Sequence, residues 1–357
     1  MPPRAQTVFI RQFIVENVTA HPQDIAAVTS RTFKISRQAV NRHLREMENS
    51  GVLLPMGRTR SKSYALREID HVVIDVQVSG LEEHIPWQNT IKDRLTDIPR
   101  NVYDVCSYGF HEMLNNVISH SESPTAQIEF SRTAECVNFV IRDSGVGIFK
   151  KIRDGFGLRD ELEAITELAK GKLTTDPKNH SGEGIFFTSR MFDVFSILSG
   201  CLYFQHTHPE NDWLLEDRVD ETQGTHIRMT ISQKSKITTK KVYAKFTSRD
   251  GESEFSKTHI PIRLFQFGTD NLVSRSQARR VLTRFEQFRE IILDFDEVAS
   301  IGQAFADEIF RVYQNEHPDV HLHHVNTSRD TLAMIRRAVL RRQEEASYDS
   351  HPEGLTF

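Results

Sequence analysis

The sequence predicts a multidomain α/β protein with three folded units and a short flexible tail. Its 357 residues exceed the ~100–200 residues of an ordinary single domain. The hydrophobic pattern changes twice along the chain: helices with two short strands come first, then long strands around one long helix, then strands that alternate with helices. We place the units at residues 1–68, 70–235 and 240–345, and the tail at 346–357.

Composition narrows the class of protein. Hydrophobic residues make up 38% and charged residues 26% of the chain, and no apolar run approaches the roughly 18–20 residues of a membrane span. The N-terminus lacks the apolar core and cleavage site of a signal peptide. The three cysteines form neither a CxxC pair nor a disulfide framework. We therefore expect a cytoplasmic protein without a membrane partner.

The charge is unevenly distributed along the chain. Residues 1–68 contain eleven Lys/Arg and five Asp/Glu, a net charge of +6. Because the whole chain carries −4, the remainder carries −10. A basic module joined to an acidic body suggests that only the first unit contacts a polyanion.

The first unit has the pattern of three helices and a basic hairpin. Apolar residues recur at near-helical spacing over residues 5–18, and Pro22 is placed to open a second helix. Ser36 and Gly51 are placed to cap and to stop a third helix. The run VLLPMGRTRSKSYAL is typical of two short strands around a basic turn. This pattern resembles the winged helix-turn-helix of bacterial regulators.

A winged helix-turn-helix would place the polar face of its third helix in the major groove of double-stranded DNA and its hairpin near phosphates or the minor groove. The candidate DNA contacts are therefore the residues opposite the apolar face of that helix and the cations of the hairpin. They are Ser36, Arg37, Gln38, Asn41, Arg42 and Arg45 on the helix, and Arg58, Arg60 and Lys62 in the hairpin. The alternative is a winged helix that contacts a protein.

The second unit is predicted to be an α/β sandwich with helices on one face of a mixed sheet. A strand, HVVIDVQV, precedes a long helix at about 100–120, and the strands AQIEFS and VNFVIRD follow it. A glycine-rich turn, DSGVGI, leads into a charged, mobile-looking stretch from 150 to 180. Then SGEGIFFTSRMFDVF resembles a loop entering a helix, and CLYFQH and THIRMTI are typical of returning strands.

This unit carries a set of residues suited to a phosphorylated ligand. Glu112, Asn116 and His120 share one helix face at i, i+4 spacing. An asparagine oxygen can complete the shell of a Mg²⁺ ion that bridges phosphates, and a glutamate one turn away can polarise a water or a hydroxyl. Asp143 can accept a hydrogen bond from an exocyclic amine. The glycines of the two glycine-rich turns allow close approach to a planar base or supply N–H groups to phosphates. These glycines are Gly145 and Gly147, and Gly182 and Gly184.

The order E-x-x-x-N-x-x-x-H, D-x-G-x-G and G-x-G resembles the GHKL ATPase superfamily, with the Bergerat fold. The first box resembles the anti-sigma-factor serine kinases. The resemblance implies ATP with Mg²⁺ on Asn116, Glu112 as general base, and Asp143 on the adenine amine. It further implies base contacts by Gly145 and Gly147, phosphate contacts by Gly182 and Gly184, and Thr225 beneath the adenine, with residues 150–181 as a lid.

Two departures from the family and one open assignment remain in this unit. Glu183 places a negative charge near the expected phosphates, and no dimerisation helix with a phospho-acceptor histidine precedes the domain. We therefore do not expect a two-component histidine kinase. Any of several lid cations could neutralise the γ-phosphate or simply be solvated. They are Lys151, Arg153, Lys170, Lys172 and Lys178.

The third unit is predicted to be a small α/β domain. We expect strands at IPIRLFQF, EIILDFD and VHLHHV, and helices at about 274–287, 303–315 and 328–340, with a frayed end after Arg342. The run EIILDFDEVASIGQAFADEIFRVY resembles STAS-like domains related to anti-sigma-factor antagonists. The phosphorylated serine of that family is replaced in the turn Gly302-Gln303-Ala304-Phe305, which favours docking or sensing. The histidines of HLHH are expected to be solvated and not to form a metal site.

The favoured hypothesis is a regulator in which ATP binding in the middle unit changes how the winged helix binds DNA, with a protein contact through the STAS-like domain. One alternative is a serine/threonine protein kinase of the anti-sigma type that acts on the STAS domain of another chain. Another is a slow ATPase that the DNA module only localises. Analogy with the family also suggests a homodimer.

Overall fold

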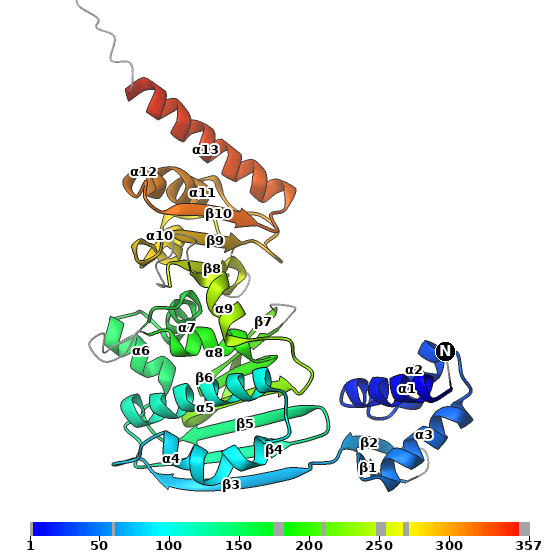
Figure 1. The fold of residues 1–357 in the computed structure, drawn as a ribbon. Coiled ribbons are helices and arrows are strands. Elements are labelled where there is room, and N and C mark those ends of the chain that lie inside the picture. The colour runs from blue at the N-terminus through cyan, green and yellow to red at the C-terminus, as the bar shows by residue number, and fades with distance from the viewer. Residues whose placement is uncertain are drawn as a thin grey trace, which may run out of the picture.

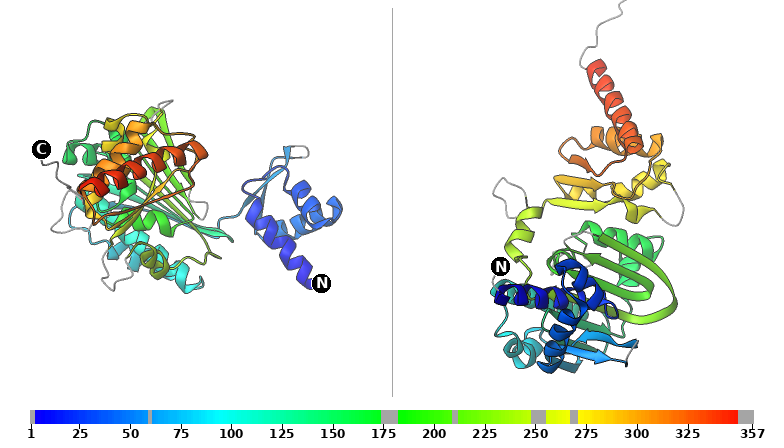
Figure 2. Two further views of the ribbon diagram at one scale, coloured as in Figure 1. Left: turned by 90° about the horizontal axis from the view of Figure 1, so that it is seen from above. Right: turned by 90° about the vertical axis from the view of Figure 1, so that its right-hand side faces the viewer.

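The computed structural model describes residues 3–58, 61–173, 182–208, 212–247, 255–266 and 271–349. Two predicted functional residues, Arg60 and Lys178, lie outside these ranges. The chain is a multidomain α/β protein, and its three units follow one another in the colour order of Figure 1. The first unit lies to one side of the other two in Figures 1 and 2.

The first unit contains the predicted three helices and two strands. They are α1 (Pro3–Asn17), α2 (Ile25–Phe33), α3 (Arg37–Asn49), β1 (Leu53–Met56) and β2 (Ser63–Leu66), and the two strands pair antiparallel. Ser36 caps α3 as predicted, because its side chain accepts a hydrogen bond from the N–H of Ala39 at 3.2 Å. Apolar side chains from all three helices and β1 form a core separate from the rest of the chain.

A five-stranded sheet forms the second unit. Its strands are β3 (Asp70–Gln77), β4 (Thr125–Arg132), β5 (Cys136–Asp143), β6 (Val194–Thr207) and β7 (Asp212–Ser232), in the order β3-β4-β5-β7-β6. Each neighbouring pair is antiparallel, so the predicted mixed sheet is wrong. The reason is that short connections join β4 to β5 and β6 to β7, and such hairpins make antiparallel pairs.

Helices cover one face of this sheet (Figure 1). The long helix predicted at about 100–120 is confirmed as α5 (Arg100–His120), which buries Val105, Phe110 and Leu114. It follows α4 (His84–Pro86) and the short helical turns η2 (Trp87–Ile91) and η3 (Lys92–Leu95). The predicted helix after Gly182 is confirmed as α8 (Gly184–Met191). The segment from Val194 to Gly200, assigned to no strand in the sequence, belongs to β6.

The charged stretch from 150 to 180 contains two helices in its described part, contrary to the mobile stretch suggested by its composition. They are α6 (Ile148–Phe156) and α7 (Glu161–Lys170). The apolar residues of α6 lie on one face, with Phe149 and Ile152 buried. Asp160 caps α7 by accepting a hydrogen bond from the N–H of Glu163 at 2.9 Å. Helix periodicity and capping therefore outweigh the high charge of this stretch.

The third unit is built on a three-stranded parallel sheet in the order β10-β9-β8. Its strands are β8 (Lys257–Pro261), β9 (Glu290–Asp294) and β10 (His321–Val325). Its helices are α9 (Thr239–Phe246), which leads into it, η4 (Ile262–Phe265), α10 (Arg275–Leu282), η5 (Phe285–Gln287), α11 (Gln303–Asp307), η6 (Glu308–Tyr313), α12 (Gln314–Glu316) and α13 (Arg329–Asp349). The frayed end expected after Arg342 is wrong as far as Asp349, because α13 continues to that residue, and the rest of the predicted tail lies outside the described residues.

The second and third units share one continuous apolar core. Phe186 on α8 packs against Phe255 with ring centroids 4.5 Å apart, and Phe255 packs in turn against Phe288 at 5.5 Å. Since this core spans both units, they pack as neighbours through buried aromatic side chains and not only through a linker.

Candidate functional site

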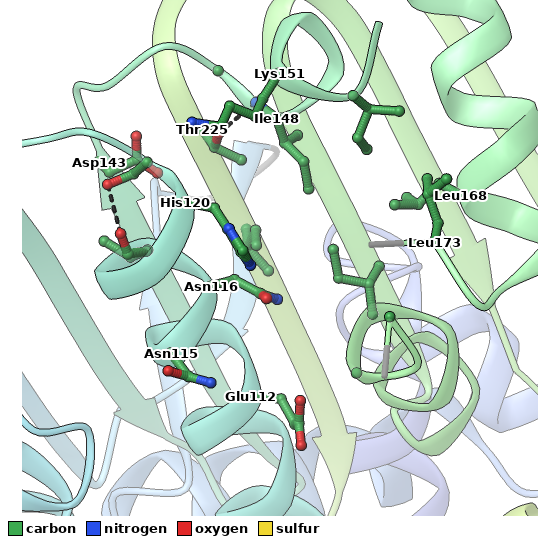
Figure 3. A pocket seen from close by; sticks show the side chains of 18 of the residues that line it. Glu112, Asn115, Asn116, His120, Asp143, Ile148, Lys151, Leu168, Leu173 and Thr225 are labelled. Atoms are coloured by element: carbon green, nitrogen blue, oxygen red, sulfur yellow. Dashed lines mark hydrogen bonds between the residues drawn. The ribbon is translucent and has the colours of Figure 1, made fainter. Parts of the chain in front are cut away.

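A cavity of about 310 Å³ lies in the second unit, among α5, α6, the end of α7, the start of α8 and β7 (Figure 3). It contains most of the site residues predicted from the sequence. Those that line it are Glu112, Asn116, His120, Asp143, Gly147, Gly182, Gly184 and Thr225. Residues distant in the sequence therefore meet in one cavity of a size suited to a small organic ligand.

Three of these residues lie along the face of α5 that borders the cavity. Glu112, Asn116 and His120 follow one another at one-turn intervals, and Figure 3 shows them along the same side of the helix. The Nδ2 atom of Asn116 is buried and has no hydrogen-bond partner among the described residues. An unpaired buried amide is costly within a protein, so this donor is available to a water or a ligand in the cavity.

Glu112 lies near the beginning of α8. Burial raises the pKa of its carboxyl, and the negative charges of Glu183 and Glu83 raise the pKa further. Gly184 leaves room for this side chain, because a Cβ atom at Gly184 would lie 2.2 Å from Glu112 Oε2. A carboxylate with a raised pKa beside a cavity is suited to accept a proton.

Asp143 ends β5 and is buried, with 6% of its surface exposed. Burial raises the pKa of its carboxyl, and hydrogen bonds from the N–H groups of Gly145 and Thr225 partly oppose this effect. The Gly145 N–H lies 2.9 Å from Asp143 Oδ1. Thr225 pairs with Asp143 across β5 and β7, and its Oγ1 accepts a hydrogen bond from the N–H of Ile148 at 3.0 Å (Figure 3).

Gly145 does not line the cavity, unlike the other glycines of the prediction. A Cβ atom at this position would lie 1.9 Å from the carbonyl oxygen of Ser121. The turn after β5 therefore passes so close to the end of α5 that only glycine fits. Gly145 is therefore a turn residue whose N–H positions the side chain of Asp143. It influences the cavity through Asp143 and does not line it.

Among the lid cations, only Lys151 lines the cavity in the part of the chain that the structure describes. Its ammonium group also pairs with Glu122. Arg153 pairs with Asp154 and Glu161. Lys170 is fully buried and directed toward the third unit. Lys172 donates to the carbonyl oxygen of Gln287 at 3.1 Å. Of the described cations in this stretch, Lys151 is thus the one that borders the cavity.

Sequence reasoning missed the apolar wall of the cavity. The missed lining residues are Asn115, Val117, Ser121, Ile148, Ile152, Phe156, Leu168, Leu173, Ile185 and Ile227. The amphipathic spacing of Ile148, Ile152 and Phe156 was the available signal, since it places them on one helix face. An apolar wall with a few polar groups is typical of a pocket for a small organic molecule.

The predicted DNA-binding residues of the third helix share an exposed surface. Ser36, Arg37, Gln38, Asn41, Arg42 and Arg45 are all exposed. Arg58 in the hairpin is also exposed. Lys62 differs, because its Nζ donates to Glu48 Oε1 at 2.7 Å and lies over the ring of Tyr64. A lysine already paired with a carboxylate contributes less to phosphate binding, so the hairpin offers fewer free cations than its sequence suggested.

Comparison with known families supports one unit directly. The family described as "STAS-like domain of unknown function (DUF4325)" matches residues 277–332. These residues form a STAS-like domain. They include β9, β10 and most of α10, and their turn into α11 begins at Gly302, without the serine of the related antagonists. No curated protein sequence matches the chain.

Two further findings concern membranes and metals. In the described ranges, no helix combines the length and the apolar character needed to cross a bilayer. Across the same residues, no group of three or more histidine, cysteine, aspartate or glutamate side chains is arranged to hold a metal ion. The histidines of β10, His321, His323 and His324, are exposed.

Proposed function

We propose that the cavity binds Mg²⁺·ATP in a GHKL-type site, and that nucleotide binding regulates a winged helix that binds DNA. The observation that carries this proposal is the convergence of Glu112, Asn116, Asp143 and Thr225 on one cavity. Sequence order alone predicted these residues as one site. They come from a helix and two strands far apart in the chain.

The residues fit a Mg²⁺ ion that arrives with phosphates. The charged residues among the described lining are Glu112, Asp143 and Lys151, so the described wall carries more negative than positive charge. A polyphosphate would be repelled there unless a divalent cation accompanied it. The unpaired Nδ2 atom of Asn116 leaves its side-chain amide free to rotate. After that rotation the amide oxygen would hold the cation as a neutral ligand. The ion would neutralise charge on the phosphates.

The other wall of the cavity fits the base. Asp143 would accept a hydrogen bond from the adenine amine, while Thr225 holds the turn at Ile148 against the strand. Ile152 and Ile227 would contact the faces of the ring. Lys151 would approach the phosphates, and Glu112 would activate a water or a hydroxyl near them.

DNA is the proposed partner of the first unit. Phosphate contacts by the exposed arginines of α3 would supply most of the affinity, and contacts with base edges would supply the specificity. We also propose a protein contact for the STAS-like domain. The protein-contact alternative for the winged helix has its own support, since Leu54 and Met56 on β1 are 43% and 54% exposed.

The double substitution Arg37→Ala with Arg42→Ala should weaken binding of the full chain to duplex DNA by about tenfold and flatten its salt dependence, because two phosphate contacts are lost. Fluorescence anisotropy over a series of salt concentrations measures both effects. The matched control is Arg336→Ala with Arg337→Ala, two exposed arginines on α13. Equal DNA affinity of the two double variants, or no DNA binding by the wild type at low salt, would favour a protein-binding winged helix.

The second candidate function is a serine/threonine protein kinase that acts on another chain. The raised pKa of Glu112 favours it, since a general base is needed for phosphoryl transfer. A slow ATPase needs the same residue. Thin-layer chromatography of γ-labelled ATP incubated with the protein distinguishes the three functions. Label on the protein indicates a kinase, and released phosphate indicates an ATPase. Unchanged ATP indicates a regulator that only binds the nucleotide.

Glu112→Gln should suppress phosphoryl transfer by about a hundredfold or more and leave ATP affinity within a few fold, because only proton transfer is removed. In a nucleotide-regulated DNA-binding protein, the variant should keep the ATP effect on DNA affinity, and this effect should last longer than in the wild type where the wild type hydrolyses ATP. In a kinase, ATP should leave DNA affinity unchanged in both proteins. Fluorescence anisotropy measures the DNA affinity of both proteins under three conditions: without nucleotide, with ADP and with ATP. Identical DNA affinities in all conditions would remove the regulator and leave the kinase and the slow ATPase.

A further inference from the structure

Residues 167–173, here called the connecting segment, lie between the cavity and the STAS-like domain. Leu168 and Leu173 line the cavity. Lys170, between them, is directed the opposite way and is fully buried. Its Nζ donates to the carbonyl oxygens of Arg280 at 3.2 Å and Thr283 at 2.9 Å, both within the STAS-like domain. One short segment thus borders the cavity on one side and the other domain on the opposite side.

A buried charged network fastens this segment. Glu167 accepts from Lys170 at 2.6 Å and from Arg284 of the STAS-like domain at 3.1 Å. Arg284 also donates to the carbonyl oxygen of Gly171 at 2.9 Å and to that of Lys172. Burial lowers the pKa of Lys170 to about 8 and also lowers the pKa of Arg284. Two cations that share one carboxylate in a buried site need each of these carbonyl contacts.

Backbone contacts hold the same segment from two further sides. Thr258 on β8 donates through Oγ1 to the carbonyl oxygen of Lys170 at 2.7 Å. Arg190 on α8 donates to the carbonyl oxygen of Ala169 at 3.2 Å. Gly171 has a φ of +86°, and a Cβ atom there would lie 2.7 Å from the rings of Phe186 and Phe255. The segment therefore has little room to move without disturbing these partners.

We propose that the connecting segment couples the cavity to the STAS-like domain, so that a nucleotide in the cavity and a partner on that domain change each other's affinity. This inference rests on the proposed function, because it requires a nucleotide that binds beside Leu168 and Leu173. A ligand that moves the backbone at these two residues would also shift Lys170, which lies between them. The network then loses contacts or adopts a second arrangement, because directional hydrogen bonds and buried charges tolerate few intermediate positions.

Thermodynamic linkage makes this coupling reciprocal. If the network favours one arrangement of the segment, weakening it must alter nucleotide affinity as well as the response of the STAS-like domain. The decisive substitution is Arg284→Asn. Arg284 has a left-handed φ of +65°, and asparagine tolerates that region better than most side chains. The variant therefore removes the contacts to Glu167 and Gly171 with little added backbone strain.

The experiment is hydrogen–deuterium exchange of the full chain with and without Mg²⁺·ATP, together with calorimetric affinity for Mg²⁺·ATP. In the wild type, nucleotide should change exchange in α10 and in residues 283–290. Arg284→Asn should lose that change and alter nucleotide affinity by about tenfold, within the range typical of coupled sites. The control Arg279→Gln lies in α10 and pairs with Glu308 inside the STAS-like domain. It should behave like the wild type.

Thr258→Val provides a second, milder test in case Arg284→Asn does not fold, since it keeps the side-chain shape and removes one hydroxyl donor. It should reduce the nucleotide-dependent change in hydrogen–deuterium exchange of residues 283–290. It should also shift the affinity for Mg²⁺·ATP in the same direction as Arg284→Asn, but by a smaller factor. Nucleotide protection confined to residues around the cavity in the wild type would overturn the coupling. The coupling would also be overturned if both variants kept the wild-type affinity for Mg²⁺·ATP and the wild-type change in exchange. Absence of nucleotide binding by the wild type would instead reject the proposed function itself.

Discussion

Asn116→Ala should lower the affinity for Mg²⁺·ATP by about a hundredfold or more. The substitution removes the proposed Mg²⁺ ligand, and loss of groups that merely support a ligand already costs about 10–100-fold in metal affinity. The fold should remain intact, because Asn116 Nδ2 has no hydrogen-bond partner to lose among the described residues. Calorimetry with ATP in the presence of Mg²⁺ measures the affinity, and circular dichroism verifies the fold.

Asn115→Ala is the matched comparison for this prediction. Asn115 is the neighbouring residue on α5 and also lines the cavity, but its Oδ1 accepts a hydrogen bond from Ser119 at 3.3 Å. We expect its loss to change affinity by less than about threefold, since this side chain already has a protein partner. If the two variants bind Mg²⁺·ATP equally well, or if Asn116→Ala binds as the wild type does, the assignment of the Mg²⁺ ligand is wrong.

Asp143→Asn should reduce the preference for ATP over GTP by about 10–100-fold. The buried carboxylate is proposed to accept a hydrogen bond from the adenine amine, and an amide in its place leaves a buried polar group mispaired, at about 1–3 kcal/mol. Competition of ATP and GTP for a fluorescent nucleotide measures the preference. Asp104→Asn, at an exposed aspartate paired with Arg100 on α5, should leave it unchanged.

The pH dependence gives a second measurement on the same residue. Burial raises the pKa of Asp143 above its ordinary value of 3.8, and the proposed contact needs the ionised carboxylate. The affinity for ATP should therefore reach its full value at pH values above the raised pKa of Asp143, and it should decline as the pH falls through that pKa. Asp143→Asn should lose this decline. An unchanged ATP preference together with an unchanged pH profile would show that Asp143 does not contact the base.

The sequence by itself predicted most of the elements and most of the polar residues that line the cavity. The i, i+4 spacing of Glu112, Asn116 and His120 on α5 requires that they share a helix face. The place of Asp143 at the end of a strand could likewise be predicted from its neighbours in the sequence, because glycines follow it directly. The three helices and hairpin of the first unit also follow from periodicity, capping and turn residues. In the third unit the strands at EIILDFD and VHLHHV were predicted correctly, whereas the strand expected at IPIRLFQF is wrong, because β8 ends at Pro261 and a helical turn follows. Each of these features depends on residues close together in the chain.

Tertiary structure alone decided three other features. Gly145 lies outside the cavity because Ser121, at the end of α5, occupies the space beside it. Lys170 looked like a candidate phosphate ligand, and long-range packing directs it instead toward the carbonyl oxygens of the STAS-like domain. The apolar wall combines side chains from separate helices and β7. These features depend on contacts between distant residues, and local spacing carries no information about which distant atoms fill the space around a side chain.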